Sequence, residues 1–426
     1  MGRVAETGDG STLSLDFTTM GTTIDSRITF SRADATARAT FINSGGFVET
    51  VPVGQPQAPR FDFVGGVAKG LLLEAPATNL TINGQYSFGN NWGASGGINV
   101  NAVSGTAGTP IARINGPDNG TLTGTSITKD AGPTFIRLFT NTTVEPSKQY
   151  TYSLYVRAGT GGESFFRLAT FDSTWMDTVG GCSDPTVTIT NNSGNGTRFA
   201  NLPTDRWVRV WVVFTTNAGQ TSTAQAIYPN TDTSAATINY IWGAQIELGS
   251  APSSVILTGA TTLVRAADTA LMTGTNFSSW YTGATSGTFV SNWYGSAATS
   301  TARSVIATSD QTTKHLHMYQ TPSALTLRLA DFPVTTVTTA NSLTAGALTK
   351  GAFSYASTAT SLCLNGGTVA TGTLAFTVAP TWLSIGGPSN NGTSITDTTA
   401  MLNNSIRTLK YFPARLSDGQ IQGLTT

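Results

Sequence analysis

Apolar and polar residues alternate with a period of two along most of this chain, which is the pattern of β-strands with one buried face. The clearest example is the run 150–157, in which Tyr150, Tyr152, Leu154 and Val156 share one face. Comparable runs lie at 165–171, 207–214, 238–248, 288–294, 315–319, 325–329, 382–387 and 406–412. Turn-forming residues separate these runs at the short spacing of sandwiches and barrels. The pattern therefore predicts an all-β protein made of antiparallel sheets.

Local signals predict two hairpins and one short helix. The run 41–50 reads as a hairpin with its turn at 43–46, and Asn365-Gly366 is expected to turn a second hairpin. Helical periodicity is almost absent elsewhere. Near the end of the chain, however, Ser417 is a suitable N-cap, and Gln420 lies at capping-box spacing.

The order of these elements predicts three regions. Residues 1–80 read as largely extended and unable to bury a core alone, so we expect an N-terminal arm that attaches to a neighbouring subunit. Residues 81–270 and 271–426 are each expected to form an antiparallel β-sandwich. The segment 250–275 contains Gly, Ser, Pro and Thr, as a linker would. The expected fold is thus an extended N-terminal arm followed by two sandwiches.

Composition narrows the function more than the strand pattern does. Charged residues make up 11% of the chain and are balanced, with Lys+Arg 23 against Asp+Glu 23. No basic stripe exists, so we expect no nucleic-acid partner. Zero net charge gives little colloidal repulsion, so solubility depends on hydroxyl and amide groups or on assembly. This composition argues against most enzymes and favours a durable part of a larger assembly.

The cysteines and the first residues add three expectations. Cys182 and Cys363 lie far apart and outside any metal-ligand pattern, so two free thiols in different domains are expected. The first residues lack the basic and apolar stretches of a secretory signal, which predicts synthesis in a cytoplasm without export. No apolar stretch is long enough to span a bilayer.

Three stretches resemble virion proteins of tailed bacteriophages. The first comprises Phe30-Ser-Arg-Ala, Pro59-Arg-Phe-Asp-Phe and Gly70-Leu-Leu-Leu-Glu-Ala, and it resembles the attachment regions of tail, fibre and head-decorating proteins. The second, 242–268, is similar to the closing strand and exit of carbohydrate-binding-module-like jelly rolls in such proteins. The third, from Leu362 to the end, resembles concanavalin-A-like domains of the laminin-G or pentraxin type.

This resemblance implies a structural virion protein, such as a fibre, spike or decoration subunit, located in the virion. It implies other virion proteins as partners through the N-terminal arm, a homotrimer, and adhesion to host-surface glycans through repeated weak sites. It implies no cofactor. Two alternatives remain open: a tail-spike depolymerase of surface polysaccharide, and a purely structural decoration with no ligand.

Four residues are candidates for carbohydrate binding. The segment Phe171-Asp-Ser-Thr-Trp-Met-Asp places Asp172, Trp175 and Asp177 close together. This arrangement is typical of a sugar-binding loop in which a tryptophan stacks on the sugar and two carboxylates accept hydrogen bonds from it. The alternative is an ordinary loop whose tryptophan belongs to the core. Trp92 lies among turn residues, which favours exposure, although a structural role in the first strand of a jelly roll is the alternative.

Catalytic and metal-binding chemistry has weaker support. A glycosidase needs paired carboxylates, and acidic residues are few and scattered. His315 and His317 point to the same strand face, and a trimer axis could bring three such pairs around a metal, but a solvated strand face is the simpler interpretation. We therefore expect no enzyme, no catalytic residue and no metal.

Overall fold

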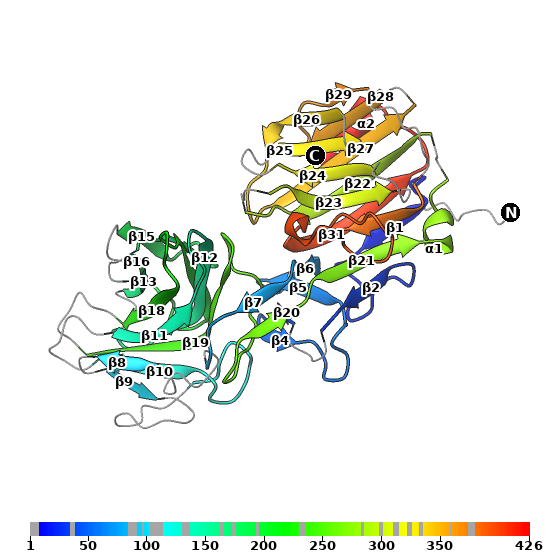
Figure 1. Cartoon of the computed structure of the whole chain (residues 1–426). Helices are drawn as coiled ribbons and strands as arrows, with labels where there is room; N and C mark the ends of the chain where they lie inside the picture. Colours follow the sequence, from blue (N-terminus) through cyan, green and yellow to red (C-terminus); the bar gives the residue numbers. More distant parts are fainter. Residues whose placement is uncertain are drawn as a thin grey trace.

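The computed structural model describes residues 8–34, 39–83, 92–95, 98–101, 114–129, 137–161, 165–172, 176–192, 196–229, 236–282, 285–297, 301–309, 315–321, 326–331, 335–357, 359–373 and 380–426. The prediction of an all-β chain with antiparallel sandwiches is confirmed (Figure 1). In this described part, helix is confined to α1 (Thr275–Ser278), the 3-10 turn η2 (Thr398–Ala400) and α2 (Asp418–Thr425). No helix among these residues is long and apolar enough to cross a membrane.

The first sandwich packs two antiparallel sheets face to face. One sheet has the order β14 (Val179–Cys182), β17 (Val208–Thr215), β12 (Gln149–Ala158), β19 (Thr237–Leu248), β10 (Thr125–Lys129), β9 (Ile98–Asn101). The other has the order β15 (Thr188–Asn192), β16 (Gly196–Ala200), β13 (Phe166–Phe171), β18 (Ser222–Pro229), β11 (Arg137–Thr143), β8 (Gly93–Ser95). Their inner faces bury one continuous apolar core between them.

The strand alternation of the first sandwich follows the sequence closely. Tyr150, Tyr152, Leu154 and Val156 of β12 all point into its core, as expected. The tryptophans on the strands of this sandwich differ in burial. Trp242 is fully buried, whereas Trp207 and Trp211 at β17 are half-buried, because they lie on the outer side of the sheet.

The second sandwich is larger and also has two sheets. One has the order β29 (Ala370–Gly372), β28 (Ala359–Leu364), β27 (Leu348–Ala356), β22 (Gly287–Tyr294), β31 (Asn404–Phe412), β6 (Val67–Leu73), β5 (Arg60–Val64), with β1 (Leu13–Asp16) also paired to β31. The other has the order β2 (Thr29–Arg32), β21 (Asp268–Thr273), β30 (Trp382–Ile385), β23 (Arg303–Ser309), β24 (His315–Gln320), β25 (Thr326–Asp331), β26 (Thr335–Ser342).

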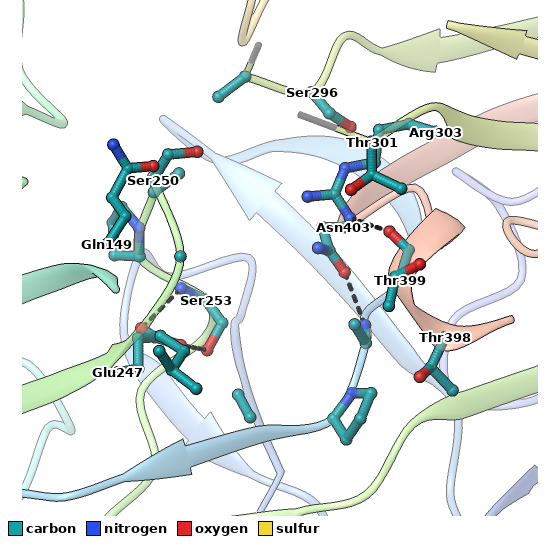
Figure 2. A pocket seen from close by; sticks show the side chains of 18 of the residues that line it. Gln149, Glu247, Ser250, Ser253, Ser296, Thr301, Arg303, Thr398, Thr399 and Asn403 are labelled. Carbon is teal, nitrogen blue, oxygen red and sulfur yellow. Dashed lines mark hydrogen bonds between the residues drawn. The ribbon is translucent and has the colours of Figure 1, made fainter. Parts of the chain in front are cut away.

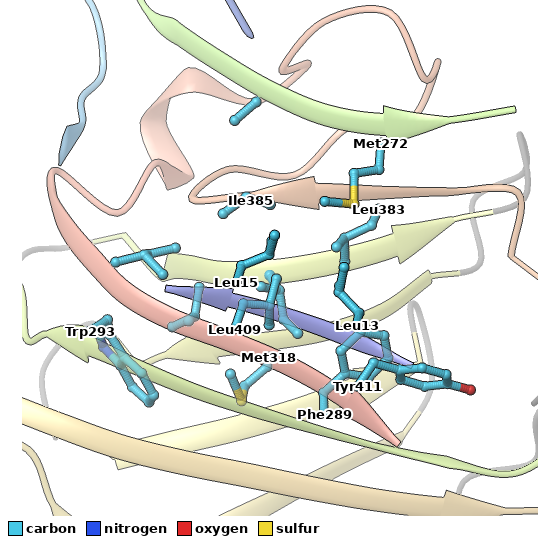
Figure 3. Close-up of a cluster of buried hydrophobic side chains, with 14 of the residues drawn as sticks. Leu13, Leu15, Met272, Phe289, Trp293, Met318, Leu383, Ile385, Leu409 and Tyr411 are labelled. Carbon is cyan, nitrogen blue, oxygen red and sulfur yellow. The ribbon is translucent and has the colours of Figure 1, made fainter. Parts of the chain in front are cut away.

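The leading segment is therefore part of the second sandwich, which corrects the expectation of a free extended arm. β1 pairs with Thr408–Tyr411 of β31, and β6 pairs with the same strand at Asn404–Ile406. Figure 3 shows Leu13 and Leu15 of β1 in the same cluster as Leu409, and both leucines are buried. These residues cannot bury a core alone, but they complete one whose other strands come from the far end of the chain.

The same segment also contacts the first sandwich. The expected hairpin forms from β3 (Thr40–Ile42) and β4 (Val48–Thr50), and Val48 packs against Trp242 and Val255. A second two-stranded sheet, β7 (Ala77–Asn79) with β20 (Leu263–Arg265), joins the chain leaving the leading segment to the chain entering the second sandwich. The leading segment thus packs on both sandwiches and holds them together.

The local predictions near the end of the chain are confirmed. Asn365 and Gly366 both have positive φ, of 48° and 65°, and the Gly367 amide donates to the Leu364 carbonyl, which closes the tight turn. Ser417 caps α2 in a capping box with Gln420.

Candidate functional site

A cleft of about 430 Å³ lies where the two sandwiches meet (Figure 2). One wall comes from the end of β19 and the turn after it, and the other from the start of β23 and from η2. Its floor is the segment 75–77 between β6 and β7. The polar side chains labelled in Figure 2 are Gln149, Glu247, Ser250, Ser253, Ser296, Thr301, Arg303, Thr398, Thr399 and Asn403.

The charged groups of this cleft are engaged by the protein itself. Glu247 is 2% exposed and accepts hydrogen bonds from the Ser253 amide at 2.9 Å and the Ser253 hydroxyl at 2.6 Å. Burial raises the pKa of Glu247, although these donors oppose the effect. Arg303 donates to the carbonyl oxygens of Thr399 at 2.9 Å and Met401 at 3.2 Å. The cleft is polar, but its charges serve mainly to fix its walls.

Glycoside hydrolysis by two carboxylates has no match in this cleft. Among its described lining residues Glu247 is the one carboxylate, whereas acid and nucleophile or base would stand about 5–9.5 Å apart. A neighbouring cavity of about 240 Å³ does contain two, Asp62 and Glu74. Asp62 accepts from the Ile42 amide at 2.8 Å, and Glu74 is ion-paired and 4% exposed, so both act as structural acceptors.

Beneath the cleft lies a buried ionic cluster, here called the junction cluster, made of Arg32, Arg60, Glu74, Arg265 and Asp268. Arg60 donates to Glu74 at 2.6 Å and to Asp268 at 2.5 Å. Arg32 donates to the second oxygen of Asp268 at 2.8 Å, and Arg265 lies 3.2 Å from Glu74. The three arginine side chains are fully buried. The cluster therefore connects the leading segment with the start of the second sandwich.

The electrostatics of the junction cluster favour the ionised carboxylates. Burial alone would raise the pKa of Glu74, but Arg265 and Arg60 beside it lower that pKa to about 2. Ser254 of the segment leaving the first sandwich also donates its amide and hydroxyl to Glu74, both at 2.7 Å. Charge pairing and hydrogen bonding together make it possible to bury these groups.

The residues of the junction cluster come from two of the stretches singled out in the sequence. Arg32, Arg60 and Glu74 belong to the leading stretch, and Arg265 and Asp268 belong to the stretch that closes the first sandwich. The sequence analysis did not anticipate that these residues meet. The available signal was the unusual density of charged residues in these short phrases within a chain that is otherwise poor in charge.

A second candidate site lies on the outer face of the sheet that contains β13. Phe166 and Leu168 point into the core, so Phe165, Arg167 and Phe171 point outward. Neighbouring strands add further rings and arginines to the same face. We call this set the arginine–aromatic face; it comprises Arg137, Phe139, Phe165, Arg167, Phe171, Arg198 and Tyr228. In Figure 1, β13, β16 and β18 lie on the side of the first sandwich away from the second.

The side chains of this face stack on one another. The guanidinium of Arg137 lies 4.8 Å from the ring centroid of Phe139 and 4.5 Å from that of Phe171. Its positive charge also acts on Tyr228, which partly offsets the burial that raises the pKa of that phenol. Phe139, Phe171 and Arg137 are half-buried, so ring and guanidinium surface remains accessible to solvent.

The structure describes three of the four residues predicted to bind carbohydrate. Trp92 is 6% exposed in the core of the first sandwich, so its indole packs against protein and cannot serve as a stacking platform. Asp172 and Asp177 are exposed at the end of β13 and just before β14. Trp175 lies outside the described residues. Asp172 directly follows Phe171, so the predicted loop borders the arginine–aromatic face, whose own residues were not predicted.

The histidine strand gives no metal site in the described part of the chain. His317 is 6% exposed and packs against Tyr319 with ring centroids 4.8 Å apart, so the expected solvated face is wrong for this residue. Among the residues described, no group of three or more potential metal ligands comes together. Both cysteines are free thiols, Cys182 in the first sandwich and Cys363 in the second, as expected.

Comparison with known proteins finds only distant structural neighbours. No protein-family model matches the chain, and no curated protein matches it either. The CBM40 of the Ruminococcus gnavus IT-sialidase, bound to α2,6 sialyllactose, is similar over 34% of this chain and 85% of its own, at 16% identity and a TM-score of 0.29. Domain 4 of AbnA, a GH43 extracellular arabinanase from Geobacillus stearothermophilus in complex with arabinotriose, covers 38% of this chain and 73% of its own, at 13% and 0.29.

A sialidase from Trypanosoma rangeli is similar over 37% of this chain and 25% of its own length, with 12% identity and a TM-score of 0.30. Scores this low do not establish a shared fold. None of these three proteins is described as a virion component.

Proposed function

We propose that this protein is a non-enzymatic adhesion protein of a tailed-phage virion that binds host-surface glycans through the arginine–aromatic face. The observation that carries the proposal is the face itself. Sugars present apolar C–H surfaces that stack on rings, and hydroxyl groups that need hydrogen-bond donors and acceptors. Phe139 and Phe171 supply half-exposed rings, and Arg137 supplies a planar donor group between them.

Binding rather than cleavage is supported by the state of the carboxylates in the two cavities. Glu247 and Glu74 are 2% and 4% exposed and are held by Ser253 and Ser254, so a polysaccharide chain has little access to them. The low pKa of Glu74, about 2, also makes it unsuitable as a general acid. A depolymerase would need an accessible pair with separated pKa values.

Attachment to other virion proteins through the leading segment is supported by exposed apolar side chains in that segment. Phe47 is 37% exposed, Val53 97%, and Val64 and Val67 54% each. These residues lie at the tip of the β3–β4 hairpin, in the loop that follows it, and at the β5–β6 turn. These exposed apolar side chains are available for contact with a partner protein. A homotrimer would multiply weak glycan sites into firm attachment.

The proposal is tested with the intact protein on a glycan array, followed by affinity measurement for the best saccharides. Binding is expected, with at least about tenfold loss in the variant Phe139→Ala/Phe171→Ala. Phe47→Ala is the matched control, because Phe47 is a half-exposed ring on a different part of the chain. Release of new reducing ends from the bound polysaccharide would contradict the non-enzymatic assignment. Absence of binding to every glycan would leave the purely structural alternative.

Virion location has its own test. Gold-labelled antibody against this protein is expected to decorate intact particles at a defined position. Particles without label, produced by cells in which the protein is abundant, would contradict the virion assignment while leaving glycan binding open.

A further inference from the structure

The arginine–aromatic face contains two arginines, Arg137 and Arg167, whose charge no described carboxylate neutralises. Arg167 is 7% exposed, and none of the described carboxylates forms an ion pair with it or with Arg137. The Nε of Arg167 is buried without a hydrogen-bond partner. The contrast with the junction cluster is clear, because each buried arginine there faces a carboxylate.

Strand pairing brings a like charge directly beside this group. Arg167 of β13 and Arg198 of β16 are Cα partners in adjacent strands, where equal charges repel. Burial lowers the pKa of Arg167, and Arg198 lowers it further, yet a guanidinium remains charged at any physiological pH. The Phe165 ring lies 5.7 Å from Arg167 and 4.1 Å from Arg198, and Tyr228 lies 5.7 Å from Arg167.

The rings compensate only part of the cost of burying this charge. A cation over an aromatic face gains about 0.5–2 kcal/mol. Removing an ion from water costs several kcal/mol unless a counter-charge or hydrogen bonds replace the lost hydration. An anion that reached both neighbouring strands would supply that counter-charge. Guanidinium groups bind carboxylate, sulfate and phosphate oxygens in a planar, two-pronged manner.

We infer that the arginine–aromatic face binds an acidic saccharide, with Arg137 directed at its anionic group, Phe139 and Phe171 at its ring, and the uncompensated charge of the more deeply buried Arg167 adding to the attraction. This inference rests on the proposed glycan-binding function and adds the chemical class of the ligand. The anionic group is a carboxylate, sulfate or phosphate carried on a sugar. The rings beside Arg137 favour a saccharide over a free inorganic ion, because the apolar C–H surface of a sugar can stack on their solvent-accessible parts and an inorganic ion cannot.

The experiment compares the affinity for an acidic saccharide with that for its uncharged ester and for two other anions. The intact protein is titrated with oligogalacturonate, with its fully methyl-esterified form, with a sulfated galactan oligosaccharide and with inorganic phosphate. An acidic oligosaccharide is expected to bind about ten- to a hundredfold more tightly than the neutral ester, and more weakly as salt rises. Which acidic oligosaccharide binds best identifies the anion.

Three arginine variants locate the anion. Arg137→Gln and Arg167→Gln should each lower the affinity for the acidic oligosaccharide towards that for its neutral ester, so that the ratio of the two affinities falls close to one. Arg157→Gln is the matched control, because this substitution removes the same charge from the other sheet. Arg157 lies there on β12 and donates to the Thr204 carbonyl. The salt titration of the unaltered protein needs no variant, so it remains decisive if Arg167→Gln fails to fold.

The outcomes separate this inference from the proposed function. Equal binding of acid and ester overturns the inference and leaves glycan binding intact. Binding of phosphate as tight as that of any oligosaccharide overturns the saccharide assignment. Loss of acid preference in Arg157→Gln to the same extent overturns the location. Absence of binding to every saccharide, neutral ones included, overturns both.

Discussion

Replacing Glu74 with glutamine tests whether the junction cluster holds the leading segment and the two sandwiches together. The substitution keeps the shape of the side chain and removes the charge between Arg60 and Arg265. Its amide nitrogen would also point a donor at groups that are themselves donors. Arg60 and Arg265 would then stay buried with one counter-charge fewer. Removing one partner of a buried ion pair is strongly destabilising, because it leaves a buried charge uncompensated.

The structure gives the magnitude. The pKa of Glu74 is about 2 in the folded protein against an ordinary value of 4.5, a difference that corresponds to roughly 3 kcal/mol in favour of the ionised form. Removing one partner of a buried pair costs about 3–5 kcal/mol. We therefore expect Glu74→Gln to lower the free energy of unfolding by about 3 kcal/mol at pH 7.

The pH dependence follows from the sign of the shift. Because the folded pKa is depressed, the stabilisation by Glu74 is complete above pH 4.5 and is lost as pH falls through about 2. The difference in the free energy of unfolding between the natural protein and Glu74→Gln should therefore decrease as the pH falls from 4.5 to about 2. At neutral pH the full difference in the free energy of unfolding is expected, and at pH 2 little of it should remain.

The assay is denaturant unfolding followed by the fluorescence of the buried Trp280 and Trp293 in the second sandwich. Glu49→Gln is the matched control, because Glu49 is exposed and, among the described residues, accepts one hydrogen bond, from the side-chain amide of the half-buried Asn43. It should change stability by less than about 0.5 kcal/mol. A loss below about 1 kcal/mol in Glu74→Gln, or a gap independent of pH, would refute the reasoning.

Two other substitutions test the packing, and a labelling experiment tests the Cys182 thiol. Gly70→Ala should destabilise the second sandwich by more than about 3 kcal/mol in denaturant unfolding, because a Cβ at this φ of +111° would lie 2.2 Å from the Ile406 carbonyl oxygen; Gly259→Ala, with open space around it, should be nearly neutral. Leu15→Ala should cost about 2–5 kcal/mol by the same measurement, whereas the exposed neighbour in Ser14→Ala should not, and a small loss in Leu15→Ala would show that β1 is dispensable. Because burial raises the pKa of Cys182 to about 11, little thiolate exists at pH 8, and a disulfide reagent should label it slowly in the folded protein and rapidly after denaturation; fast labelling of the folded protein would contradict this.

The sequence was sufficient for features encoded within a few residues. Period-two alternation located the strands, Asn365-Gly366 located a tight turn, and Ser417 with Gln420 located the final helix. In each case the physical cause is local: side-chain direction along a strand, tolerance of positive φ, or the unsatisfied amides at a helix start.

Features that depend on distant pairing could not be read in this way. β1 pairs with β31 at the other end of the chain, and alternation says which face is buried but not which strand lies beside it. The junction cluster likewise pairs Arg60 with Asp268, although the strands of the first sandwich separate these two residues in the sequence. The same limit explains why the leading segment was interpreted as an arm.

The candidate site was missed for a different reason. The run 165–171 predicts a strand, and this is confirmed, but the predicted site residues lie in the loop after this strand and at Trp92 rather than on its second face. On that face the alternating positions are Phe165, Arg167, Ala169 and Phe171, which places a charge among rings. Its partners Arg137 and Tyr228 come from other strands, so only the sheet order assembles the site.

Hydroxyl-radical footprinting of the intact protein tests the central claim most directly, because it reports the solvent access of aromatic side chains with and without a bound glycan. The saccharide that binds best is expected to protect Phe139 and Phe171 and to leave Phe47 unchanged, since Phe47 lies on the β3–β4 hairpin. Protection around the inter-sandwich cleft with no change at Phe139 and Phe171 would contradict the proposed site.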